Sequence, residues 1–425
     1  FYQNLHTSDL WLEEKFEDIL KPRVSDYHFY DEMYGFQLQF GSEIRNHLLT
    51  YGIDYSLTKN EYYQDKYEII YGVIDREFDI NTGKYPIKRS PDSETNKFSL
   101  FLQDEISFGV YNITAGIRFD NYKLDALSDT TYTNYCKGIG ASCQLENLNI
   151  PNFSPKISLI RPLNKDLKIW GKYSRGFKAP TWWELQANHS NLTLDNNPYR
   201  SIPNPNLKPE SSDGFEIGIK GNYQKYKFEL IGFYNIYHDL ISTNSYKENL
   251  IVDGEIKNVT TRQKVNLDKA RTWGLEMKNK YKFNPDGKGF TFKTGAAFTH
   301  GQDITENKPL NTIDPFKLIA GLEYASQNNK FVGEIIGTYV GTVRREKEID
   351  KSDGKRYFLP KPYFNFDFLT KYKYSNSIDF SFGLYNIFNS TYYIANNISA
   401  TQKNEGVGQF AEPGRHFRVG FKFIF

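Results

Sequence analysis

The chain has 425 residues with 53 basic and 51 acidic side chains. The resulting net charge of +2 excludes the large excess of basic residues that is typical of nucleic-acid-binding proteins. Aromatic residues make up 16% of the chain, yet the mean hydropathy is −0.63 and no 18 apolar residues run together, which excludes helical membrane spans. A membrane β-barrel reconciles these facts better than a soluble all-β protein, because only alternate residues of each strand need to face lipid.

Apolar and polar residues alternate in pairs of segments along the chain, as in strands with one face in lipid and the other in a wet lumen. Seven hairpins are predicted, joined by short turns: 34–42 with 47–58, 97–108 with 111–124, 154–161 with 167–176, 214–222 with 226–239, 269–283 with 289–301, 315–325 with 330–341, and 364–374 with 378–384. Much longer polar stretches lie between the pairs: 59–96, 125–153, 177–213, 240–268, 302–314, 342–362 and 389–412. Short turns on one side and long loops on the other are typical of outer-membrane barrels.

The last strand runs to Phe425 and carries an aromatic or apolar residue at every second position. It supplies an edge that has to pair with the first strand, because an open edge in hydrocarbon leaves backbone amides without partners. With a further strand in residues 1–29, the count is 15 or 16, whereas plugged transporters have about 22. A complete 16-stranded porin fits this count.

The two cysteines, Cys136 and Cys143, lie in the polar stretch 125–153. In an exported protein their spacing predicts a local disulfide that closes a surface loop, and in a cytosolic protein they would be free thiols. The spacing does not match a Cys-x-x-Cys metal motif, and we predict neither a zinc site nor an intrinsic cofactor.

The stretch between two strands near residues 173 and 216 carries the most specific residues. It contains a first box (Phe177, Lys178, Ala179, Pro180), then Trp182, Trp183 and His189, and then a second box (Asn204, Pro205, Asn206, Leu207). This order resembles the haem and haemoglobin receptors among the TonB-dependent outer-membrane transporters, which carry a Phe-Arg-Ala-Pro box, a histidine and an Asn-Pro-Asn-Leu box. The first box departs from that pattern at Lys178, where a cation is kept but Arg and Lys are not equivalent in a bidentate contact.

The resemblance spans about residues 91–425 and implies a 22-stranded plugged barrel in the outer membrane. Residues 1–425 would then be its barrel domain, with the plug and the first strands preceding Phe1. It implies that haem, or a haem carrier such as haemoglobin, binds at the extracellular loops and that haem iron passes into the periplasm. A TonB-ExbB-ExbD energy complex would act as partner through the plug. Siderophore and transferrin receptors of the same superfamily carry less complete versions of these boxes and are the alternative.

His189 is the candidate axial ligand of haem iron, since a neutral imidazole ligates iron in many haem sites; the alternative is an ordinary surface histidine. Trp182 and Trp183 are candidates for stacking on a porphyrin, or belong to an aromatic girdle at the membrane interface. Three cations are candidates for pairing with haem propionates, or for contacts with lipid headgroups or loop carboxylates: Arg175, Lys178 and Arg200.

The other histidines have weaker surroundings. His28 lies among aromatic residues, and His238 precedes Asp239 within a strand pattern, so structural roles are favoured for both. Serine-hydrolase, phosphate-loop and His-Glu-x-x-His signatures are absent from the sequence, which argues against an enzyme.

Overall fold

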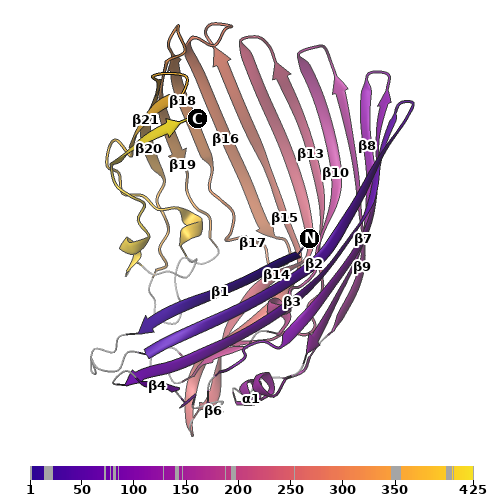
Figure 1. Cartoon of the computed structure of the whole chain (residues 1–425), viewed down its shortest axis with the longest axis vertical. Helices are drawn as coiled ribbons and strands as arrows, with labels where there is room; N and C mark the ends of the chain where they lie inside the picture. Colours follow the sequence, from indigo (N-terminus) through magenta and orange to yellow (C-terminus); the bar gives the residue numbers. More distant parts are fainter. Residues whose placement is uncertain are drawn as a thin grey trace.

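The computed structural model of the chain is a curved sheet of long antiparallel strands (Figure 1). The structure describes residues 2–13, 23–70, 73–76, 78–79, 83–84, 86–127, 129–138, 143–145, 147–186, 188–192, 198–252, 254–345, 356–398, 404 and 406–424. Within these ranges the wall belongs to one 20-stranded sheet that also includes short strands of the connections. β5 (Phe78–Asp79) pairs with β6 (Gly83–Lys84) in a separate two-stranded piece.

All seven predicted hairpins are confirmed, and most of their strands run past the predicted bounds. They are β2 (Arg23–Ile44) with β3 (His47–Ile70), β7 (Asp92–Phe108) with β8 (Tyr111–Leu127), β9 (Leu148–Pro162) with β10 (Leu167–Lys178), β13 (Glu210–Asn222) with β14 (Tyr226–Val252), β15 (Glu255–Lys282) with β16 (Gly289–Asp303), β18 (Lys317–Ala325) with β19 (Phe331–Val340), and β20 (Tyr363–Lys373) with β21 (Ile378–Tyr385). Each hairpin also pairs with the next, so the wall continues without a break to β22 (His416–Phe423).

The additional strand predicted within residues 1–29 is present as β1 (Tyr2–Glu13), which pairs with β2. Among the described residues, β1 pairs only with β2 and β22 only with β21, so the predicted pairing of first and last strand is not formed in this part of the chain. The terminal residue Phe425 lies outside the described residues.

The prediction of a polar loop over 240–268 is wrong. β14 and β15 continue as one antiparallel ladder up to the pair Val252 and Glu255, and β12 (Tyr199–Ile202) adds to β15 in parallel. Beyond the lipid, neither face of a strand has to be apolar, so the alternation that marks a strand disappears while its hydrogen bonds persist. Figure 1 shows the short turns gathered at one end of the sheet and this extension, with α1 (Thr130–Gly138), at the other.

The strand register gives the sheet two different faces. One face carries exposed apolar residues in directly opposed pairs, such as Phe40 with Tyr51, and Ile217 on this face is 70% exposed. The opposite face carries ion pairs, such as Lys172 with Glu216. We refer to these as the apolar face and the polar face.

The longer connections hold short elements: β4 (Val73–Arg76), α2 (Trp182–Gln186), β11 (His189–Asn191), β17 (Lys308–Pro309) and the 3-10 turns η1 (Ala395–Asn397) and η2 (Val407–Phe410). Cys136 in α1 and Cys143 form a disulfide. No helix in the described ranges is both long and apolar enough to cross a bilayer.

Candidate functional site

The segment between β10 and β13 begins with a capped helical turn. Thr181 precedes α2, and its hydroxyl accepts a hydrogen bond from the backbone N–H of Glu184 at 3.2 Å. In return, Glu184 Oε2 accepts from the backbone N–H and the hydroxyl of Thr181 at 3.0 and 3.1 Å. This reciprocal capping box satisfies the donors that a helix start leaves open, and it sets the direction of the chain after Pro180.

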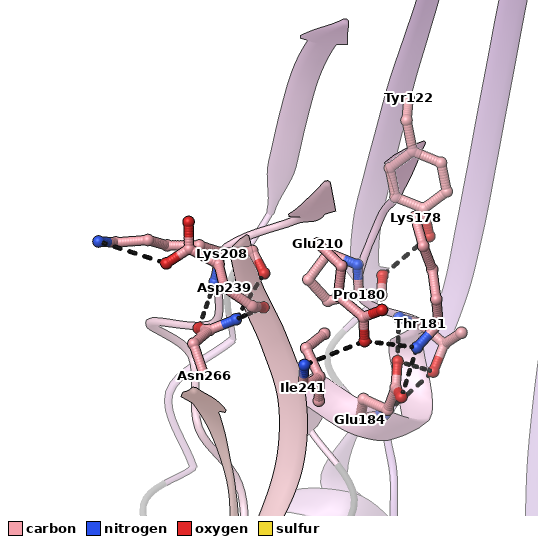
Figure 2. A network of polar contacts seen from close by, with 10 residues as sticks. All are labelled: Tyr122, Lys178, Pro180, Thr181, Glu184, Lys208, Glu210, Asp239, Ile241 and Asn266. Carbon is pink, nitrogen blue, oxygen red and sulfur yellow. Dashed lines mark hydrogen bonds and ion pairs between the residues drawn. The ribbon is translucent and has the colours of Figure 1, made fainter. Parts of the chain in front are cut away.

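Lys178 of the first box ties this turn to the end of the segment. Its ammonium donates to Glu184 Oε1 at 3.0 Å and to Glu210 Oε1 at 3.2 Å (Figure 2). The same oxygen of Glu210 accepts the backbone N–H of Ile241 at 3.0 Å. Burial alone would raise the pKa of Glu184, but its hydrogen bonds to Thr181 and Lys178 lower that pKa below its ordinary value.

A second group of contacts holds the residues just before Glu210. Asn266 Oδ1 accepts the backbone N–H of Lys208 at 2.9 Å, and its Nδ2 donates to the carbonyls of Lys208 and Asp239 at 3.0 and 2.6 Å (Figure 2). Asp239 has a left-handed φ of 54°, so this amide holds an unfavourable backbone conformation in place. The segment is thereby fastened to both β14 and β15, which together form the extended hairpin.

The second box packs among the residues that lie between β10 and β13 and against the extension of β14 and β15, which we call the loop layer. Asn204 donates through Nδ2 to the carbonyl of Lys264 at 2.8 Å, and its backbone N–H donates to the carbonyl of Leu185 at 3.0 Å. Leu207 is 4% exposed and packs with Leu185 and Leu124, which are fully buried. The two boxes therefore hold this layer in shape through polar contacts and one apolar cluster.

His189 lies in β11, opposite Ser201 of β12, and its ring is half-buried. Its Nε2 is 3.1 Å from the hydroxyl of Tyr199, whose ring meets the imidazole edge-on at 5.3 Å. Nδ1 is buried without a hydrogen-bond partner among the described residues. Burial, together with the charges of Arg89 and Arg262, lowers the pKa of His189 to about 4, so the imidazole is neutral at neutral pH.

Three neighbours of His189 did not follow from the sequence analysis: Tyr199, Arg89 and Arg262. The guanidinium of Arg262 lies 5.3 Å from the centre of the Tyr199 ring. Arg262 is in the extension of β15 that the sequence predicted as loop, and Arg89 precedes β7, about a hundred residues before the histidine in the chain. Local spacing carries no signal for contacts that depend on how strands pair.

The two tryptophans lie in α2 and pack edge to face at 5.5 Å. Trp182 packs against the apolar cluster of Leu185 and Leu207. Trp183 contacts Tyr62 of β3, which is 1% exposed and pairs with Phe29 at 4.7 Å. Both tryptophans thus lie where α2 meets the wall.

The three candidate cations are in different surroundings. Arg200 donates to Glu248 at 2.9 Å and to Thr261 at 3.1 Å, both on the extended hairpin. Lys178 is held by carboxylates of its own segment. Arg175 is exposed, and the register puts it on the apolar face, two residues from Tyr173. The structure does not bring the three cations together around one ligand.

The remaining histidines have ring or acid contacts that suit structural roles. His28 stacks on Tyr63 at 4.4 Å and lies 3.0 Å from Asp26, while His238 is 3.7 Å from Asp213. In the part of the chain that the structure describes, no three His, Cys, Asp or Glu side chains gather in a group that could hold a metal ion.

Two clefts lie away from this segment. One, of about 680 Å³, is at the short-turn end and includes Lys168, Lys220 and Lys280 among its lining residues. The other is apolar, has a volume of about 450 Å³ and lies over Phe40, Leu102 and Phe153 on the apolar face. Neither contains a residue that the sequence singled out.

A wall of long antiparallel strands with an apolar face, a polar face, short turns at one end and a folded layer at the other defines the β-barrel class of outer-membrane proteins. A family model described as "TonB dependent receptor-like, beta-barrel" matches residues 2–387, and the chain belongs to this family. The family comprises transport receptors of the outer membrane.

Curated relatives are about a quarter identical to this chain over the aligned residues. A "Probable hemoglobin and hemoglobin-haptoglobin-binding protein 4" of Haemophilus influenzae is 25% identical over 62% of the chain and 28% of the relative. The "Hemoglobin-haptoglobin utilization protein B" of Neisseria meningitidis is 23% identical over 74% and 42%, and the "Hemin receptor" of Yersinia enterocolitica is 26% identical over 61% and 38%. The chain therefore spans less than half the length of these relatives.

Solved structures show the same fold. The "Copper transporter OprC" superposes with a TM-score of 0.68 at 16% identity, over 95% of this chain and 57% of that chain. A ferric enterobactin receptor of Pseudomonas aeruginosa gives 0.68 at 18% identity, over 95% and 58%. Identities this low show that the fold is shared, but they do not identify the ligand.

Proposed function

We propose that this chain is the barrel portion of a receptor that binds haem, or a haem carrier such as haemoglobin, and passes haem iron into the periplasm. The observation that carries the proposal is its similarity to three proteins named for haemoglobin or haemin, each aligned over more than 60% of this chain. The order of the two boxes around His189 supports the same branch of the family.

His189 is the proposed axial ligand of the haem iron. A depressed pKa keeps its imidazole neutral, which is the form that binds iron. In the tautomer where Nε2–H donates to the Tyr199 hydroxyl, the lone pair on Nδ1 is buried and has no partner among the described residues, so a movement of the surrounding loop would let it bind iron. Arg89 and Arg262, whose charges act on this ring, are the proposed partners of the propionates.

Energy coupling belongs to the proposal as well. The family is TonB-dependent, and the chain spans 28–42% of the three curated relatives. We infer that a plug domain of the whole receptor gates passage through the barrel and contacts a TonB-ExbB-ExbD complex. In this scheme the chain described here provides the membrane wall and the outer binding layer.

Growth on defined iron sources tests the ligand class. A strain lacking the complete receptor should fail to grow on haemoglobin or haemin and should grow normally on ferric siderophores. The His189→Ala receptor should restore haem-dependent growth only weakly, whereas His47→Ala, at the short-turn end of the wall, should restore it fully. If the strain lost growth only on a ferric siderophore, the protein would be a siderophore receptor instead.

A further inference from the structure

Lysines lie directly opposite one another on the polar face, close to the short turns. The register pairs Lys168 of β10 with Lys220 of β13, and one step nearer the turns it pairs Lys227 of β14 with Lys280 of β15. Lys168 is on the same face as Lys172, because side chains on one face of a strand recur at every second residue. Like charges that are directly opposite repel, so both pairs destabilise the wall as it stands.

Little negative charge offsets this group. Glu229 lies between Lys220 and Lys278 in the row that begins with Lys168, and its carboxylate is 3.2 Å from the ammonium of Lys220. Four other lysines of the group form no ion pair with any residue that the structure describes: Lys168, Lys227, Lys278 and Lys280.

The next strand shows that this face can neutralise a lysine. Lys293 of β16 lies directly opposite Lys280, and its ammonium is 2.6 Å from Glu323 and 3.1 Å from Glu334. Carboxylates of β18 and β19 thus hold Lys293. The wall supplies no such pair of carboxylates to the lysines of β10, β14 and β15.

The same lysines line the cleft of about 680 Å³ at the short-turn end. Two carboxylates are among its lining residues, Asp166 and Glu229. Six lysines also line it: Lys165, Lys168, Lys220, Lys227, Lys278 and Lys280. The lining therefore has an excess of four positive charges, whereas the whole chain has a net charge of only +2. Positive charge is concentrated at this cleft.

The dimensions of the group suit a small ligand. With strands about 4.8 Å apart and a rise of about 3.4 Å per residue, the two rows cover roughly 14 Å from β10 to β15 and roughly 7 Å along the strands. A ligand with two anionic groups could therefore contact both rows. Lysine ammonium groups bind anions as point charges on flexible stems, so no fixed fork geometry is required. The polar face of such a wall lines the lumen, and the ligand would reach the cleft from inside the barrel.

We propose that this cleft is an anion-binding site for a small ligand that carries two carboxylates. Resting on the proposed function, we assign the site to the transported haem, which has two propionates on one edge of its macrocycle. The loop layer with His189 lies at the other end of the wall, so the cleft would receive the haem after it has left the histidine. The propionates then neutralise lysines that the wall leaves unpaired.

Binding of iron-free protoporphyrin to the complete receptor tests the site, because this probe has both propionates and no iron for His189. Its dimethyl ester lacks the two charges and is the comparison, and native mass spectrometry counts bound porphyrin. Wild type should bind protoporphyrin more tightly than the ester. Lys168→Gln with Lys280→Gln should weaken the binding of one protoporphyrin about tenfold, and Lys168→Arg with Lys280→Arg should retain it.

Lys371→Gln with Lys373→Gln is the matched control. Both lysines are on the polar face beside another short turn, between β20 and β21, and they do not line the cleft. This variant removes the same number of charges from the same end of the wall and should leave protoporphyrin binding unchanged.

Four results would overturn the site: equal binding of protoporphyrin and its ester by wild type, equal binding by wild type and the Lys168, Lys280 Gln variant, equal loss in the control, or displacement by inorganic phosphate at the same concentration. The last would indicate a site for free anions. Because opposed lysines repel, the Gln variant should unfold no earlier than wild type. Earlier unfolding without lysine-dependent porphyrin binding would mean that another part of the receptor covers the cleft, which also contradicts the proposal.

Haemin separates this site from the proposed function. The shift of the haemin Soret band that we assign to His189 should be the same in the Lys168, Lys280 Gln variant as in wild type. A wild-type receptor that leaves the haemin spectrum unchanged would contradict the proposed function, whereas lysine-dependent binding of protoporphyrin decides the cleft.

Discussion

Lys178 and Glu210 lie opposite each other at the outer ends of β10 and β13, with Nζ 3.2 Å from Oε1, and they join the first box to a residue 32 positions further along the chain. The same ammonium reaches Glu184 at the start of α2. One cation therefore closes the base of the segment that carries His189.

Replacing Lys178 by Gln should loosen residues 181–209 while the wall remains intact. Lys178 is 48% exposed, so the two ion pairs together are expected to stabilise this segment by only about 1 kcal/mol. Hydrogen exchange of the segment should accelerate several-fold, and Lys178→Arg should remain near wild type. Lys172→Gln, which removes the ion pair with Glu216 lower on the same strand, should leave the segment's exchange unchanged; equal effects of both Gln variants would contradict this role.

Leu185→Ala should open the loop layer more strongly. Leu185 is fully buried against Leu124 and Leu207, and truncating a buried leucine costs about 2–5 kcal/mol. Local opening measured by hydrogen exchange should spread from α2 to the second box. Leu163→Ala, in a short turn where the side chain is 45% exposed, is the matched control and should change little.

The environment of His189 should make the loop layer sensitive to acid. The pKa of the folded state is about 4, below the ordinary value of 6.5, so the unfolded segment takes up a proton first as the pH falls. The stabilisation is fully present above pH 6.5 and is lost progressively as the pH falls towards 4. The charges of Arg89 and Arg262 act on the ring, and the Tyr199 hydroxyl contacts its Nε2.

Limited proteolysis of residues 188–202 at pH 7 and pH 5 measures this effect. Cleavage should rise at pH 5 in wild type and should show little pH dependence in His189→Gln. An unchanged acid response in the variant would assign the sensitivity to another group.

Removing the disulfide between Cys136 and Cys143 should disturb the neighbourhood of His189. The bridge closes a short loop at α1, where Tyr132 accepts a hydrogen bond from Nδ2 of Asn188 at 3.3 Å. A loop of this size predicts a loss of about 2–3 kcal/mol in local stability for the Cys136→Ser, Cys143→Ser variant. Exchange at residues 188–191 should increase, and a reducing agent should have this effect on wild type only.

Much of the wall could be predicted from the sequence, because lipid imposes a two-residue period wherever one face is apolar. Where β14 and β15 pass beyond the apolar band, that constraint ends, and the prediction failed at 240–268. The pairing of Arg200 with Glu248 was hidden for the same reason, since the glutamate lies in that extension. Sequence motifs located His189 and the boxes, but the neighbours of His189 follow from strand pairing between distant segments.

Visible absorption of haemin added to the complete receptor tests the central claim most directly. Wild type should shift the Soret band with saturable binding, and His189→Ala should weaken or abolish that shift while His47→Ala leaves it intact. A wild-type receptor that leaves the haemin spectrum unchanged, or a His189→Ala variant that reproduces the wild-type shift and affinity, would contradict haem ligation at this site.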